Sequence, residues 1–178
     1  MSYNIRYDNE WDKVNSWEIR KDEVIKLIYE YDPGIIGIQE GLLNQVRYIK
    51  NALNNYDYFG VGRDDGKDKG EFCSIFYDKT RYDLQKSSTF WLSETPRVPS
   101  IGWDAAINRI VTLGVFKIKN LGKELIIYNT HFDHIGKVAR EKSASIILNP
   151  VSYTHLRAHE TPEHLGCRLQ RVKKKGGG

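Results

Sequence analysis

Hydrophobic residues along the chain recur with two different periods, which separate helical segments from extended ones. Apolar positions three to four residues apart predict helices over residues 18–31, 42–53 and 138–148. Shorter apolar or alternating runs predict strands over residues 3–7, 35–39, 56–61, 72–77, 82–92, 110–118 and 124–130. The order is β-α-β-α, then a run of strands and a last helix, which predicts an α/β (α+β) fold of packed sheets flanked by helices.

The end of the chain reads differently from the rest. Residues 151–161 match the translation, in one reading frame, of a transposon-end sequencing adapter, and the chain closes on runs of lysine and glycine. We therefore expect residues 1–149 to be the N-terminal part of a domain. We expect residues 150–178 to be a non-native, disordered tail, and we exclude them from the fold.

Setting this tail aside changes the charge and the cysteine content. The whole chain has 27 Lys and Arg against 23 Asp and Glu, but residues 1–150 have 21 of each. The basic character that would indicate nucleic-acid binding therefore belongs to the tail. Cys73 remains as a single cysteine, which permits no internal disulfide and leaves the compartment open. The sequence shows no signal peptide at its start, although Met1 can be an internal methionine of a longer gene that carries a leader. No apolar run reaches the ~18 residues that a membrane span needs.

Polar residues stand at the ends of three predicted strands. Asn4 lies on the first strand, Glu40 directly follows the apolar run 35–38, and His131 follows the strand 124–130. Taken singly, each has an ordinary interpretation: Asn4 as a turn or edge residue, Glu40 as a helix-start carboxylate, and His131 as an ordinary histidine. Since strand ends in layered α/β folds are where ligands bind, the three together predict one functional rim.

This set of side chains suits phosphoester hydrolysis with Mg²⁺ or Mn²⁺. Mg²⁺ prefers oxygen ligands and is usually held by one or two carboxylates together with water and substrate phosphate. Glu40 supplies a carboxylate. An amide such as Asn4 can orient a phosphate oxygen or a metal-bound water, and an imidazole such as His131 can donate to the phosphate or relay a proton.

Three motifs carry a family resemblance: Ser2-Tyr3-Asn4-Ile5-Arg6-Tyr7-Asp8, Ile36-Gly37-Ile38-Gln39-Glu40 and Asn129-Thr130-His131-Phe132-Asp133-His134. In this order, the chain resembles the endonuclease/exonuclease/phosphatase superfamily of deoxyribonuclease-like hydrolases, over residues 1–149. Gly62-Arg63-Asp64-Asp65-Gly66 and two later segments resemble an uncharacterised bacterial branch of it. The resemblance implies a four-layer α/β sandwich of two mostly antiparallel sheets flanked by helices, incomplete in this chain.

The resemblance also implies roles for individual residues. The family's metal ligand matches Glu40, the residue that contacts metal-bound water and phosphate matches Asn4, and the histidine at the scissile phosphate matches His131. Asn4 is therefore expected to serve both catalysis and the metal.

Further positions take secondary roles from the same resemblance. Glu71 lies where some members place an active-site acid, although a solvated strand-entry charge is an equal alternative. Arg109 and Asn129 are expected to contact the substrate phosphate. The alternative for Arg109 is that it is an ordinary cation on the protein surface. Asp133 and His134 are expected to support the loop of His131.

Two later motifs of the family are missing from the sequence. Members carry a Gly-Asp-x-Asn segment that positions the attacking water and a final Ser-Asp-His that completes the site, and neither occurs here. We therefore expect a complete parent protein to be an active phosphodiesterase or phosphatase, and this 178-residue chain to be inactive.

Two other functions stay open. His131-Phe132-Asp133-His134 is similar to part of the zinc motif of metallo-β-lactamase-like hydrolases, but the first histidine of that motif would fall at Asn129. The second alternative is a non-catalytic binding module on the same fold. The substrate is a phosphoester of undetermined kind: nucleic acid, nucleotide, phospholipid head group or inositol phosphate. No obligate protein partner is evident.

Overall fold

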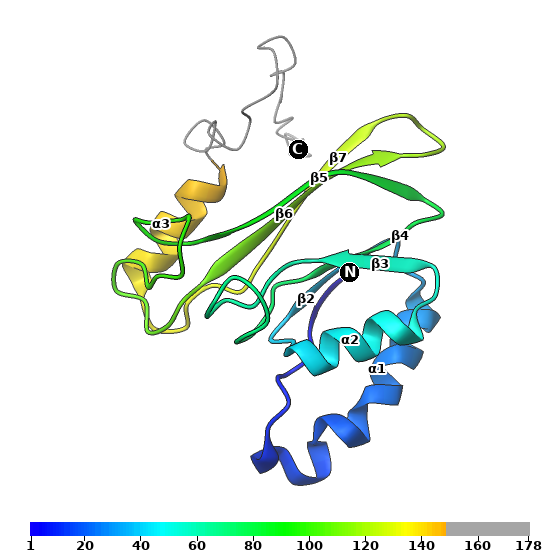
Figure 1. Ribbon diagram of the computed structural model, residues 1–178, viewed down its shortest axis with the longest axis horizontal. Helices are drawn as coiled ribbons and strands as arrows, with labels where there is room; N and C mark the ends of the chain where they lie inside the picture. The colour runs from blue at the N-terminus through cyan, green and yellow to red at the C-terminus, as the bar shows by residue number, and fades with distance from the viewer. Residues whose placement is uncertain (149–178) are drawn as a thin grey trace, which may run out of the picture. The chain divides into compact units, whose positions relative to one another are not determined.

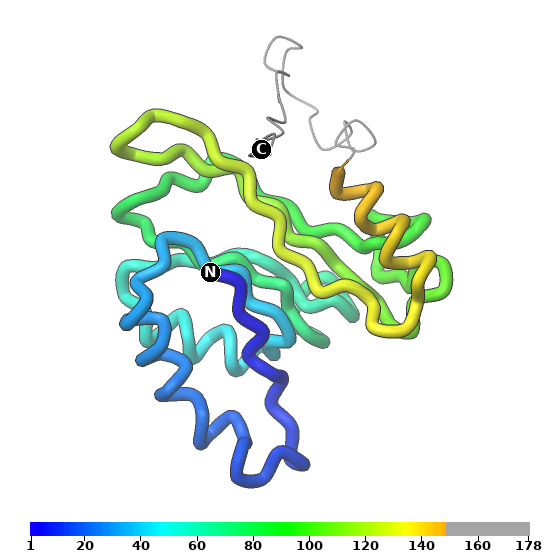
Figure 2. Tube along the Cα trace, turned by 180° about the vertical axis from the view of Figure 1, so that it is seen from behind, coloured from blue at the N-terminus to red at the C-terminus, as the bar shows by residue number. Residues whose placement is uncertain are grey.

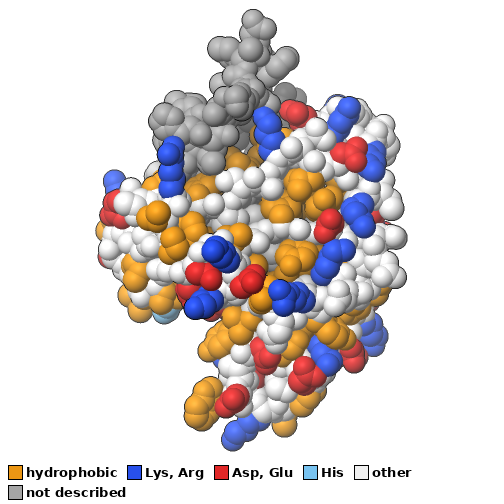
Figure 3. Space-filling model, in the orientation of Figure 1, with side chains coloured by type: hydrophobic (Ala, Val, Ile, Leu, Met, Phe, Trp, Pro, Cys, Tyr) orange, Lys and Arg blue, Asp and Glu red, His pale blue; other side chains and the backbone are white. Residues whose placement is uncertain are grey.

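The computed structural model describes residues 1–148, drawn as a ribbon in Figure 1 and as a space-filling view in Figure 3. The predicted non-native tail, from residue 150 onward, lies outside the described residues. Within residues 1–148, no helix combines the length and the apolar character needed to cross a membrane.

The first sheet is mixed, and two helices cover one of its faces. Its strands lie in the order β1 (Ser2–Asn4), β2 (Ile35–Gln39), β4 (Ile75–Asp78) and β3 (Tyr56–Phe59). The pair β1–β2 is parallel, and the other two pairs are antiparallel. The covering helices are α1 (Trp17–Tyr31) and α2 (Leu43–Ala52). Between helices and sheet lies a core that includes Trp17, Ile28, Ile36, Ile38, Val46, Ile49 and Phe76.

The second sheet is antiparallel, with the order β5 (Tyr82–Trp91), β6 (Ile110–Ile118) and β7 (Glu124–Thr130). A tight turn joins β6 to β7, and Gly122 takes a φ of 64° there, a left-handed conformation that glycine adopts without steric cost. The helix α3 (Lys137–Leu148) follows β7.

The two sheets face each other, and the helices lie on their outer sides, so the layers run helix, sheet, sheet, helix (Figures 1 and 2). Aromatic side chains fill the space between the sheets: the ring of Phe116 lies 6.0 Å from that of Phe59 and 5.3 Å from that of Tyr77. A Cβ added to Gly114 would stand 2.6 Å from the Phe59 ring, so the sheets approach closely at this point. The predicted four-layer sandwich is confirmed.

The predicted elements agree with the structure except at some ends. The strand expected over 72–77 begins only at Ile75, because Phe72 makes isolated bridges to Gly41 and Gly62 instead. The first strand ends at Asn4, since Arg6 turns the backbone to a left-handed φ of 60°. The short 3-10 helix η1 (Glu10–Asn15) was not predicted, because its sequence has no apolar period.

Candidate active site

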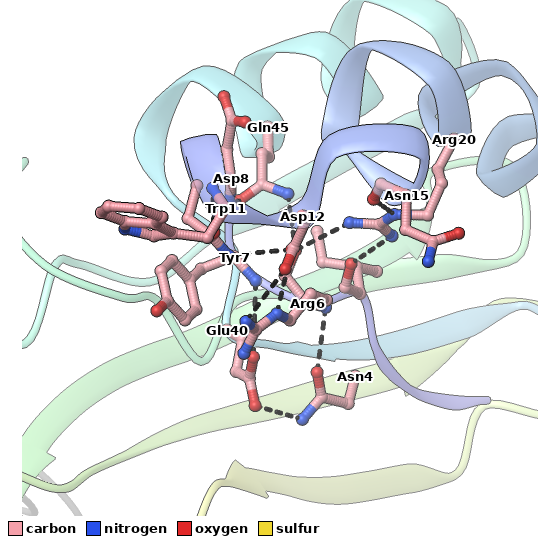
Figure 4. Close-up of polar contacts among 12 residues, drawn as sticks. Asn4, Arg6, Tyr7, Asp8, Trp11, Asp12, Asn15, Arg20, Glu40 and Gln45 are labelled. Atoms are coloured by element: carbon pink, nitrogen blue, oxygen red, sulfur yellow. Dashed lines mark hydrogen bonds and ion pairs between the residues drawn. The ribbon is translucent and has the colours of Figure 1, made fainter.

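Asn4 and Glu40 meet at the carboxyl ends of two neighbouring strands. Parallel pairing of β1 with β2 sets Asn4 opposite Gln39, so Glu40 follows at the same edge of the sheet. The Asn4 Nδ2 donates to Glu40 Oε1 at 2.8 Å (Figure 4). Glu40 has a φ of 62°, a conformation that costs energy for a residue with a side chain and is concentrated at functional sites.

The backbone that follows β1 holds both polar side chains in place. The Arg6 backbone N–H donates to Asn4 Oδ1 at 3.0 Å, and the Tyr7 N–H lies 3.4 Å from Glu40 Oε2. The carboxylate of Glu40 keeps 18% of its side-chain surface exposed. The pair is thus oriented by the chain but open to a ligand.

His131 reaches the same rim from the second sheet, directly after β7. Its Nδ1 lies 4.0 Å from Glu40 Oε1. Burial of the ring, followed by the charge of Arg109, lowers the pKa of His131, although Glu40 and Glu71 act in the opposite direction. The ring is therefore mainly neutral near pH 7. The buried Nδ1 has no hydrogen-bond partner among residues 1–148, and such an unsatisfied polar atom is rare enough in a folded protein to call for an explanation.

The charge of Glu71 acts to raise the pKa of the His131 imidazole. It is not a solvated strand-entry charge. Arg63 Nη1 donates to Glu71 Oε2 at 2.7 Å, and both side chains are mostly buried. Arg63 belongs to the motif 62–66, but nothing in that motif indicates its pairing with Glu71.

Arg109, Asp133 and His134 form a separate cluster behind the loop of His131. Burial alone would raise the pKa of Asp133. The carboxylate accepts hydrogen bonds from backbone N–H groups, including those of Gly136 and Ile135, and from the Arg109 guanidinium. These hydrogen bonds outweigh the effect of burial and hold the pKa of Asp133 well below its usual range. Arg109 Nη2 also lies 3.1 Å from His134 Nδ1. In this arrangement the guanidinium is engaged by the loop, and its charge still acts on the imidazole of His131.

Asn129 lies between the two sheets rather than on the rim. Its Nδ2 donates to the carbonyl oxygens of Ile38 at 2.9 Å and Ser74 at 2.8 Å, and its Oδ1 accepts from Gln39 Nε2 at 2.6 Å. The side chain is 5% exposed. Asn129 thereby ties β7 to β2 and to the entry of β4, two residues before His131 and close to Glu40.

The rim presents the kind of oxygen ligand that a hard divalent cation prefers. Among residues 1–148, no three His, Cys, Asp or Glu side chains cluster closely enough to hold a metal ion by themselves. Structural and catalytic zinc needs at least three such ligands, whereas Mg²⁺ retains water and takes one or two carboxylates. Glu40, with Asn4 beside it, matches the second case, since each oxygen of Glu40 has accepting capacity beyond its one hydrogen bond.

Comparisons with known proteins agree with this geometry. No family model matches the sequence. The chain is 32% identical over 136 residues to an uncharacterized protein of Acanthamoeba polyphaga mimivirus, covering 71% of this chain and 50% of the viral protein.

Two solved bacterial structures are more similar. An endonuclease/exonuclease/phosphatase from Bacteroides vulgatus is 44% identical with a TM-score of 0.83, covering 88% of this chain and 59% of that one. A mannosyl-6-phosphatase of Bacteroides thetaiotaomicron is 43% identical with a TM-score of 0.83, covering 92% of this chain and 60% of that one. The chain therefore spans between half and three fifths of the length of these proteins. By sequence motifs and by fold, it belongs to the endonuclease/exonuclease/phosphatase family.

Proposed function

We propose that the complete protein hydrolyses phosphoesters with the help of Mg²⁺ or Mn²⁺, and that residues 1–148 supply the first part of its active site. The observation that carries the proposal is the convergence of Asn4, Glu40 and His131 from both sheets onto one rim. The mannosyl-6-phosphatase among the similar structures supports hydrolysis of a phosphoester.

Each side chain has a role that its environment supports. Glu40, assisted by Asn4, would hold the cation, which polarises phosphoryl oxygens and offsets charge that develops in the transition state. The Asn4 amide would orient the phosphate or a water molecule. His131, neutral near pH 7 and with a free buried Nδ1, would hydrogen-bond the phosphate or move a proton at that nitrogen.

Glu71 and Arg63 would act on the same region as a pair. The hydrogen bond of 2.7 Å from Arg63 holds the Glu71 carboxylate, whose charge acts to raise the pKa of His131. Arg63 Nε is buried and makes no hydrogen bond among residues 1–148, and it lies 3.8 Å from Asp64 Oδ1. An unsatisfied buried N–H is costly, so this donor is a candidate to bind a substrate oxygen. Arg109, engaged by Asp133, would act on phosphate mainly through its charge.

The two alternatives are less well supported. A metallo-β-lactamase-like zinc site would need a histidine at position 129, where the buried Asn129 joins the sheets. Burial also raises the pKa of Cys73, the only cysteine in the described part of the chain, to about 12, which disfavours a thiolate ligand. A non-catalytic module would give no reason for the strained φ of Glu40.

The test compares the complete protein with two variants, Glu40→Gln and His131→Ala. We expect each to lose roughly 10²-fold or more in kcat on phosphoesters while its circular dichroism spectrum stays unchanged, because each removes one group that acts on the phosphate. EDTA should abolish turnover, and Mg²⁺ or Mn²⁺ should restore it. Glu23→Gln, on the exposed face of α1, is the matched control.

A folded wild-type protein without metal-dependent turnover on sugar phosphates, nucleotides or a phosphodiester would refute the proposal. The 178-residue chain itself should show no turnover, because it lacks the Gly-Asp-x-Asn and Ser-Asp-His motifs. Hydrolysis by this chain would show that residues 1–148 are sufficient for catalysis.

A further inference from the structure

The segment between β1 and α1, residues 5–16, forms a loop that adjoins the candidate active site. We call it the N-terminal loop. It begins at Ile5, directly after Asn4, and contains η1. Its Tyr7 N–H lies against Glu40 (Figure 4), so its conformation is linked to that carboxylate.

Two side chains from the helices hold the backbone of this loop. Gln45, which is fully buried on α2, donates to the Arg6 carbonyl at 2.9 Å and accepts from the Asp8 N–H at 3.0 Å. Arg20, on α1, donates to the carbonyl oxygens of Ile5 at 2.8 Å and Asn15 at 2.6 Å. Both ends of the loop are therefore fixed to the helical layer.

A second network fixes the loop from within. Arg6 makes two parallel hydrogen bonds of 3.1 Å to the carboxylate of Asp12, and Asn9 Nδ2 donates to the same carboxylate at 2.8 Å. The Oδ1 of Asn9 accepts from the Trp11 N–H at 2.9 Å. Arg6 and Lys13 both take left-handed φ values, which such contacts must stabilise against the steric cost.

Despite these anchors, the loop presents aromatic rings to solvent. Trp11 is 85% exposed, so its ring contributes little to the packing of the fold. Tyr7 is half-buried, with the Arg6 guanidinium 4.5 Å above its ring. Figure 4 shows both rings leaving the loop on the same side. The loop is anchored to both helices, it contacts Glu40 through the Tyr7 N–H, and it presents the exposed ring of Trp11. Such a loop offers a preorganised stacking surface next to the proposed metal ligand.

We propose that Trp11, with Tyr7, binds the ring of the organic group esterified to the phosphate, and so determines which esters are accepted. The inference rests on the proposed function and names its substrate class: phosphoesters of a sugar or a nucleoside. Aromatic faces bind the apolar face of a sugar ring and stack on bases without hydrogen-bond readout. Arg6 is engaged by Asp12, so the loop contributes a ring surface rather than a further phosphate site.

The kinetic test uses the complete protein with mannose 6-phosphate, adenosine 5′-phosphate and the acyclic glycerol 2-phosphate. Trp11→Ala should raise KM for at least one ring ester about tenfold more than KM for glycerol 2-phosphate, with a smaller effect on kcat. Trp11→Phe should restore most of the loss. Tyr31→Ala, which removes another exposed aromatic at the far end of α1, is the matched control. Equal effects of Trp11→Ala on all three esters would overturn the inference.

A binding measurement separates this inference from the proposed function. The indole N–H resonance of Trp11 is identified by its loss in Trp11→Phe, and its shift is followed as each ester is added with Mg²⁺. We expect a shift with a ring ester and none with glycerol 2-phosphate. A shift without turnover of any of these esters, or of a phosphodiester, would refute the proposed function but would support the stacking surface. Turnover without a shift, and without a selective KM effect, would refute the surface alone.

Discussion

Replacement of Asn129 by alanine tests whether this residue joins the sheets or contacts phosphate. The substitution removes three hydrogen bonds from a side chain that is 5% exposed, to Gln39 Nε2 and to the carbonyl oxygens of Ile38 and Ser74. A typical intramolecular hydrogen bond contributes about 1 kcal/mol net, so we expect a loss of roughly 3 kcal/mol in the free energy of unfolding. The loss should not exceed this by much, because Ser74 O also accepts from the Ile38 N–H and Gln39 Nε2 also donates to Gly37 O.

Urea denaturation followed by tryptophan fluorescence measures this loss. With slopes of about 1–3 kcal/mol per molar for a chain of this size, the midpoint should fall by roughly 1–3 M. Tyr128→Thr is the control, since the neighbouring side chain points to the outer, solvent-exposed face of β7, and its effect should stay under ~1 kcal/mol.

The opposite result would also be informative. If Asn129→Ala unfolds within ~0.5 kcal/mol of the wild-type chain, the three hydrogen bonds do not hold the sheets together as argued. If stability is kept while the complete protein loses turnover, Asn129 contacts the phosphate, as the sequence alone predicted.

Two further predictions concern stability. The folded-state pKa of Asp133 lies below its unfolded value of about 3.9, so its contribution is complete above about pH 5 and is lost as the pH falls below that. Asp133→Asn should lower the free energy of unfolding by roughly 3–5 kcal/mol at pH 7, because it leaves Arg109 buried without its charged partner. In this variant, the urea midpoint should fall less between pH 6 and pH 3 than it does in the wild type. If the stability of the variant falls equally steeply with acid, other carboxylates cause the acid dependence. Gly114→Ala should destabilise by about 1–3 kcal/mol in the same assay, because its Cβ would stand 2.6 Å from the Phe59 ring, and an unchanged midpoint would show that the sheets can separate locally.

Periodicity and local chemistry in the sequence determined most of the secondary structure. The strands β2, β6 and β7 were predicted with the residues that the structure shows, because each is a clear apolar or alternating run ended by polar residues. Helix ends differed by one residue or so. The motifs around Asn4, Glu40 and His131 also predicted that these side chains meet at one rim, and they predicted the family.

Pairings between distant segments were decided only by the tertiary structure. Asn129 and His131 stand two positions apart in one motif, yet one side chain points between the sheets and the other to the rim. The partner of Glu71, Arg63, lies eight residues earlier in a polar loop. The exposed position of Trp11 depends on hydrogen bonds from Gln45 on α2 and Arg20 on α1 to the backbone of the N-terminal loop. Hydrophobic periodicity encodes which residues are buried, whereas these contacts depend on which strand and helix faces meet, and that is set by packing across the whole fold.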